Sequence, residues 1–138
     1  MHRNEASIEI AAPPEAVFAR IVSPEERVRW VSGLVSSEET EAGAYREVVE
    51  DHGLRLELDV LTERSEAPTA VDARMTGRGL RATVTNRLEP TAGGTRLTVR
   101  VESEYGGLAR FAAPLVTRHA QGNLESSLAR LKQLVESG

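Results

Sequence analysis

The sequence predicts an α+β fold in which a curved antiparallel sheet is closed by one long C-terminal helix. Between Leu54 and Tyr105, apolar residues occupy every second position of successive segments, which is the pattern of strands with one buried face. After Tyr105 the apolar residues adopt helical spacing and keep it as far as Ser137. A curved sheet that holds a helix in this way usually encloses a cavity.

The N-terminal part predicts a short strand and two short helices. Ser7–Ala11 alternates as a strand does, and Pro13 ends it. Pro14–Val22 places its apolar residues on one helical face, and a proline in the first helical turn costs no hydrogen bond. A second helix follows from Ser23, where Ser-Pro-Glu-Glu forms a capping box, and Trp30 lies on its apolar side.

Six further strands are expected, separated by short turns that require antiparallel neighbours. Setting Leu88 opposite Leu97 on the last two strands also sets Arg81 opposite Glu104, which is an attractive cross-strand pair, so we expect this register. The expected strands are Leu34–Glu39, Ala44–Glu50, Leu54–Arg64, Thr69–Thr76, Leu80–Glu89 and Thr95–Tyr105.

The C-terminal segment carries two apolar stripes on nearly opposite sides. One stripe runs from Pro114 to Glu136 at helical spacing, whereas Leu108 and Phe111 lie on the other side. Because a proline inside a helix removes a hydrogen bond, we expect a kink or a fresh helix start near Pro114.

Length and composition limit the possible functions. A chain of 138 residues predicts a single domain over 1–138, and the absence of cysteine, membrane-span-length apolar runs and a leader predicts a cytoplasmic protein. The net charge of −4 argues against nucleic-acid binding. The sequence has no His-x-x-x-His pair, calcium-type acidic loop or Walker-type lysine loop. We therefore expect no metal and no cofactor.

Four stretches of sequence resemble the START-like (SRPBCC, Bet v 1-like helix-grip) superfamily, and most closely its polyketide cyclase/dehydrase-like branch. They are IEIAAPPEAVFARI at Ile8–Ile21, the tryptophan Trp30, GGTRLTVRVES at Gly93–Ser103 and LESSLARLKQLVES at Leu124–Ser137. The resemblance implies the helix-grip fold, with seven strands and a deep hydrophobic pocket between the sheet and the terminal helix. Members of the superfamily bind lipids, sterols, polyketides or plant hormones, and some are cyclases or hydrolases.

Our leading interpretation is a protein that binds a small hydrophobic or amphipathic molecule, such as a lipid or polyketide. Asn86, Ser103 and Tyr105 interrupt an otherwise apolar inward phase. A buried polar group needs a partner, so these residues either bond to the protein's own backbone or orient a ligand. The candidate ligand-binding residues are Phe18, Trp30, Leu58, Met75, Val84, Asn86, Val101, Ser103, Tyr105, Phe111 and Leu115.

Two other functions stay open. A cyclase or dehydratase would use Tyr105 as proton donor or oxyanion partner and His119, or a pocket water, as base. This requires His119 to turn inward, although its spacing places it opposite the apolar stripe between Pro114 and Glu136. Alternatively, the apolar groove binds another protein or a second copy of the chain, so both monomer and homodimer are possible. The strand carboxylates that we considered as bases, Glu57, Asp59, Asp72, Glu102 and Glu104, all fall on the outward phase.

Overall fold

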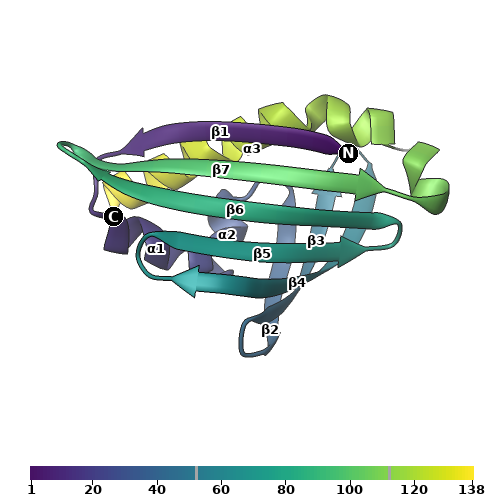
Figure 1. Cartoon of the computed structure of the whole chain (residues 1–138), viewed down its shortest axis with the longest axis horizontal. Helices are drawn as coiled ribbons and strands as arrows, with labels where there is room; N and C mark the ends of the chain where they lie inside the picture. The colour runs from purple at the N-terminus through teal and green to yellow at the C-terminus, as the bar shows by residue number, and fades with distance from the viewer. Residues whose placement is uncertain (52, 112) are drawn as a thin grey trace.

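The computed structural model describes residues 1–51, 53–111 and 113–138, apart from the side chains of residues 108, 115 and 116. The elements follow one another in the predicted order, with a short 3-10 helix before the last helix (Figure 1). They are β1 (His2–Ile10), α1 (Pro14–Val22), α2 (Pro24–Trp30), β2 (Leu34–Glu41), β3 (Ala44–Asp51), β4 (Leu54–Glu66), β5 (Ala70–Gly77), β6 (Leu80–Thr91), β7 (Gly94–Tyr105), η1 (Gly107–Phe111) and α3 (Ala113–Ser137).

Within the described residues, seven strands form one antiparallel sheet in the order β1-β7-β6-β5-β4-β3-β2. The sheet curves, so that β2 and β3 turn away from the plane of β5, β6 and β7, and the helices lie behind it (Figure 1). This architecture confirms the predicted α+β helix-grip fold.

The predicted register and most predicted boundaries are confirmed. Leu88 pairs with Leu97 and Arg81 with Glu104, as the charge pattern indicated. The six strands after α2 begin and end within two residues of the predicted positions. Ser23 caps α2, because its hydroxyl accepts a hydrogen bond from the backbone N–H of Glu26 at 3.4 Å.

The first strand is longer than Ser7–Ala11, the range that the alternation predicted. β1 pairs with β7 from His2 opposite Ser103 to Ile10 opposite Thr95. The residues at its beginning are all polar, so they show no alternation that would predict a strand. This part pairs with β7 nonetheless, because the backbone N–H and C=O groups form the ladder whatever the side chains are.

The fresh helix start near Pro114 is also confirmed. η1 ends at Phe111, and α3 begins at Ala113 and continues to Ser137. The C-terminal half of α3 packs on the sheet and on α1, where Leu131 is completely buried. This filled end of the interior contains Ile10, Val17, Phe18, Ile21, Leu88, Leu97, Leu128, Leu131 and Val135.

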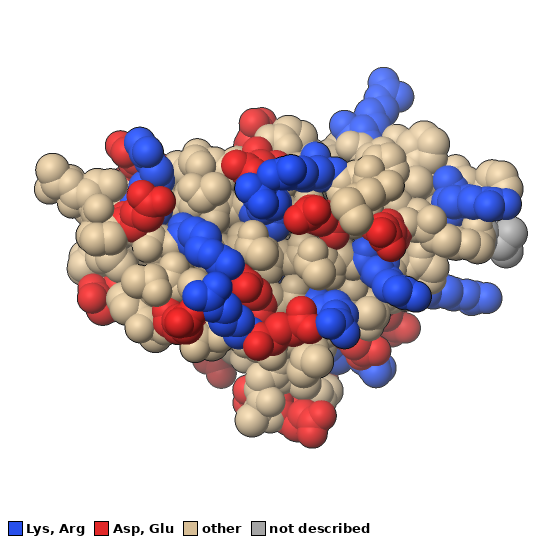
Figure 2. All heavy atoms as spheres, in the orientation of Figure 1, with Lys and Arg blue, Asp and Glu red and all other residues tan. Residues whose placement is uncertain are grey.

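The outer face of the sheet is polar, with acidic and basic side chains interleaved over its surface (Figure 2). Many of these charges pair between neighbouring strands. Glu9 of β1 meets Arg96 of β7 at 3.0 Å, and Arg46 of β3 meets Asp59 of β4 at 3.0 Å. Exposed pairs of this kind favour the observed register but contribute little stability each.

Candidate functional site

A pocket of about 280 Å³ lies between the inner face of the sheet and the helices α2 and α3. Strand alternation directs apolar side chains of β3, β4, β5, β6 and β7 into it, and α3 contributes residues spaced four apart. The apolar lining residues are Trp30, Val31, Val49, Leu54, Leu56, Leu58, Met75, Val84, Val99, Val101, Ala120, Leu124 and Leu128.

A second pocket, of about 240 Å³, lies beside the first and extends toward the end of α1 and the turn between β2 and β3. The two pockets share four lining residues, Arg27, Met75, Val84 and Asn86. Two of these are polar, so hydrogen-bonding groups stand where the two apolar spaces adjoin.

Another hollow, of about 560 Å³, lies on the opposite side of the sheet. Its lining includes Arg46, Arg55, Glu57, Asp59 and Arg78, which are exposed. A site for a small molecule normally buries most of its ligand against apolar side chains. We therefore place the candidate site on the inner face.

The most buried charge in the first pocket belongs to Glu47 of β3, whose side chain is 2% exposed. Arg27 of α2 donates to both of its carboxylate oxygens, from Nε to Oε2 at 2.8 Å and from Nη2 to Oε1 at 3.0 Å. Ser37 of β2 donates a further hydrogen bond to Oε2 at 2.8 Å. This bidentate pair compensates the buried charge and ties α2 to the sheet.

The end of α2 holds Arg27 and Trp30 in place. The Arg27 guanidinium carbon lies 5.7 Å from the centroid of the Trp30 ring, and the indole N–H donates to the Arg20 carbonyl at 3.1 Å. Gly33 then adopts a φ of +78°, and a side chain there would come within 2.7 Å of the Glu50 carbonyl. Glycine therefore allows the chain to leave α2 and enter β2 close beside β3.

Sequence reasoning missed Glu47, although one signal could have found it. In the β3–β4 hairpin Asp51 pairs with Leu54, and counting back along both strands sets Glu47 opposite Leu58. Residues that pair directly point to the same face. Glu47 therefore had to share the inward phase of Leu58, in contrast to the outward carboxylates that we considered.

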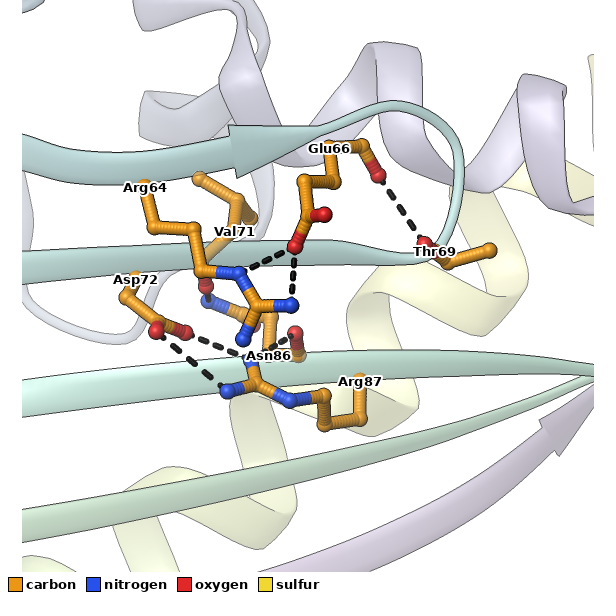
Figure 3. Close-up of polar contacts among 7 residues, drawn as sticks. All are labelled: Arg64, Glu66, Thr69, Val71, Asp72, Asn86 and Arg87. Atoms are coloured by element: carbon orange, nitrogen blue, oxygen red, sulfur yellow. Dashed lines mark hydrogen bonds and ion pairs between the residues drawn. The ribbon is translucent and has the colours of Figure 1, made fainter.

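Asn86 of β6 is buried and lines both pockets. Its amide nitrogen donates to the Val71 carbonyl across the sheet at 3.3 Å (Figure 3). Its Oδ1 accepts no hydrogen bond from any described residue. The next residue, Arg87, points to the other face and pairs with Asp72. Adjacent residues of β6 thus face opposite sides of the sheet: Asn86 faces the pocket and Arg87 faces the outer surface.

The far rim of the first pocket is closed by hydrogen bonds from α3. The amide of Asn123 donates to the Asp51 carboxylate at 2.9 Å. The Ser127 hydroxyl accepts from the backbone N–H of Ser32 at 2.8 Å and donates to the Asn123 carbonyl at 2.8 Å. These bonds hold α3 against the β3–β4 turn and against the segment that follows α2.

Several residues predicted from the sequence line the first pocket together. They come from α2 and from four neighbouring strands, as the inward phase requires. They are Trp30, Leu58, Met75, Val84, Asn86 and Val101.

Other predicted residues lie elsewhere. Phe18 belongs to the filled end of the interior, because α1 packs beneath the C-terminal half of α3. Phe111 is 72% exposed, since η1 ends outside the sheet. His119 is half-buried on α3 and lines neither pocket. The side chain of Leu115 lies outside the described residues.

Ser103 and Tyr105 lie at the end of β7, beyond the lining of either inner pocket. The Tyr105 ring packs edge-on against His2, with ring centroids 5.7 Å apart. Burial raises the pKa of the Tyr105 phenol above its ordinary value, although a hydrogen bond with Ser103 acts in the opposite direction. The two proposed catalytic groups, Tyr105 and His119, are thus not brought together at the pocket.

Comparisons with known proteins agree with this architecture. A family model described as polyketide cyclase / dehydrase and lipid transport matches residues 1–136. No curated protein matches the sequence significantly. No described helix is both long enough and apolar enough to span a bilayer.

Solved bacterial structures share the fold over nearly their whole length. A protein of Thermus thermophilus superimposes with a TM-score of 0.83 at 22% identity, covering 97% of each chain. A conserved protein of Geobacillus kaustophilus gives 0.83 at 17% identity, covering 97% of this chain and 95% of its own. One from Deinococcus radiodurans gives 0.77 at 18% identity over 99% of both chains. At these identities the similarity shows the fold alone.

Proposed function

Because the chain belongs to the polyketide cyclase/dehydrase and lipid transport family, we propose that it binds a small apolar or amphipathic molecule between its sheet and α3. The observation that carries this proposal is the apolar pocket of about 280 Å³, lined from both sides and crossed by few polar groups. Burying roughly 200 Å² of apolar ligand surface there would contribute about 5 kcal/mol before the cost of association.

Binding without a reaction is the function that the pocket's chemistry supports best. Its lining carboxylates, Glu47 and Asp51, are both engaged by protein donors. A carboxylate whose oxygens already accept hydrogen bonds from protein donors is poorly placed to take a proton from a substrate. The cyclase interpretation would use Tyr105 as proton donor or oxyanion partner and His119, or a pocket water, as base, but Tyr105 and His119 line neither pocket.

The most direct test is native mass spectrometry of freshly purified protein. We expect a copurified molecule that is lost when the pocket is filled by Ala120→Trp, since Ala120 lines the pocket on α3. The matched control is Ala129→Trp, because Ala129 is exposed on the same helix. Retention of the same molecule by both variants at equal occupancy would contradict the proposed site.

A further inference from the structure

The Arg27–Glu47 pair has unused hydrogen-bonding capacity beside the pocket. Arg27 uses Nε and Nη2, whereas no described residue accepts from Nη1. On Glu47, Oε2 accepts from both Arg27 and Ser37, whereas Oε1 accepts from Arg27 and from no other described residue. A carboxylate oxygen can accept a second hydrogen bond, so an open acceptor lies next to open donors.

The charges at this point are already balanced. The single negative charge of Glu47 is compensated by the guanidinium that it contacts, and the surrounding walls are apolar. The remaining charged residue that lines the pocket, in the described part of the chain, is Asp51. A ligand carboxylate would therefore enter as an uncompensated charge in a poorly hydrated space. A ligand cation would meet the guanidinium, and the Asp51 carboxylate at the far rim is already engaged by Asn123.

Asn86 adds a third polar group on the wall that the two pockets share. Its Oδ1 accepts no hydrogen bond from any described residue. Every fully buried side-chain oxygen or nitrogen among those residues has a hydrogen-bond partner, so Oδ1 is not fully buried. This oxygen is therefore accessible from the pocket and can accept from a ligand hydroxyl.

On the premise that the pocket binds a small molecule, we propose that Arg27, Glu47 and Asn86 select an uncharged ligand bearing a hydroxyl or carbonyl oxygen. A carbonyl oxygen accepts from the guanidinium, and a hydroxyl can in addition donate to Glu47 or Asn86. The apolar remainder of the ligand lies against the shared wall of Met75 and Val84. A simple fatty-acid carboxylate is the wrong ligand for this arrangement.

The test uses four probes built on one ring system: naphthalene, 2-naphthol, 2-naphthoate and the ammonium form of 2-naphthylmethylamine. Their dissociation constants are measured by equilibrium dialysis at pH 7 with protein freed of any copurified molecule. We expect 2-naphthol to bind about tenfold more tightly than naphthalene, because a hydrogen bond to a charged group typically contributes that much. Both charged probes should bind more weakly than naphthalene.

Two sets of variants assign the selectivity to the pair. Arg27→Met with Glu47→Leu removes both charges together, a change that proteins commonly tolerate, and should abolish the preference for 2-naphthol over naphthalene. Glu47→Gln leaves Arg27 uncompensated and should raise the affinity for 2-naphthoate about tenfold. The matched control on the outer face is Arg87→Met with Asp72→Leu, which should leave all four constants unchanged. Thermal melts followed by circular dichroism verify folding of each variant.

The outcomes separate this inference from the proposed function. Equal binding of naphthalene and 2-naphthol, or tightest binding of either charged probe, overturns the selectivity while the pocket remains a binding site. The same holds if the inner double variant keeps the preference for 2-naphthol. Failure of all four probes to bind overturns the proposed function and this inference with it.

Discussion

Two arginine–carboxylate pairs, one on each face of the sheet, show how differently the two faces use the same chemistry. On the inner face, Glu47 is 2% exposed and Arg27 22% exposed, and the pair borders an apolar pocket. On the outer face, Asp72 pairs with Arg87 (Figure 3). Their side chains are 22% and 40% exposed.

Geometry alone does not set the role of an ion pair. Both pairs are bidentate. Water screens the outer pair, so it mainly favours the register of β5 and β6. In the inner pair the Glu47 carboxylate has almost no contact with water, so its charge depends on Arg27. The inner face should therefore respond much more strongly to substitution than the outer face.

The largest expected effect is the loss of stability when a buried leucine, rather than an exposed one, is shortened to alanine. Leu131→Ala removes a completely buried side chain from the filled end of the interior and should lower the free energy of unfolding by about 3 kcal/mol. Leu61→Ala on β4, where the side chain is 49% exposed, should cost at most about 0.5 kcal/mol. Urea denaturation measures both, and similar losses would contradict the assignment of the two faces.

The second effect compares the two carboxylates directly. Glu47→Ala leaves the Arg27 guanidinium and the Ser37 hydroxyl without their acceptor, and should cost about 2 to 3 kcal/mol. Asp72→Ala should cost about 0.5 kcal/mol. The measurement is again urea denaturation at pH 7. A loss from Asp72→Ala as large as that from Glu47→Ala would show that the two environments are equivalent.

A smaller expected effect is the difference in how strongly salt changes the stability losses of these two variants. At about 1 M ionic strength the screening length falls to roughly 3 Å, which weakens exposed pairs more than buried ones. The destabilisation caused by Asp72→Ala should therefore shrink in 1 M sodium chloride, while most of that caused by Glu47→Ala should persist. Parallel urea titrations at low and high salt measure this, and an equal salt dependence for the two variants would count against it.

The smallest effect concerns Glu136, which lies on the exposed side of α3. Its carboxylate accepts from the backbone N–H of Ala11 at 2.8 Å and from Lys132 at 2.6 Å. These hydrogen bonds, that with Ala11 first, lower the pKa of Glu136 below its ordinary 4.5. The stabilisation is therefore present above pH 4.5 and is lost as the pH falls through the lowered pKa.

Glu136→Gln should consequently narrow the drop in melting temperature between pH 7 and acid pH by a small amount. Exposed Glu15 on α1 offers a control, since its side chain forms no ion pair with any described residue. An unchanged acid dependence in Glu136→Gln would show that this contact contributes nothing measurable.

Much of the fold could be predicted because period-two alternation and short turns are local properties of the chain. They placed Leu58, Met75 and Val84 on one face of the sheet, which the structure brings together with Trp30 at one pocket. The prediction failed to find Glu47 because we counted carboxylates only on strands whose phase was already assigned. The hairpin register that turns Glu47 inward becomes evident when both strands are aligned across Asp51 and Leu54.

The sequence by itself determined the strand phases, the register of β6 with β7, the break before α3 and the resemblance that the family match confirms. Only the tertiary structure decided which part of the inner face is filled and which part is hollow. That division depends on how far the sheet curves and where α3 crosses it, and both result from contacts between residues distant in the chain. For the same reason Phe18 lies in the filled end and Phe111 outside, although the sequence places each on an apolar helical stripe.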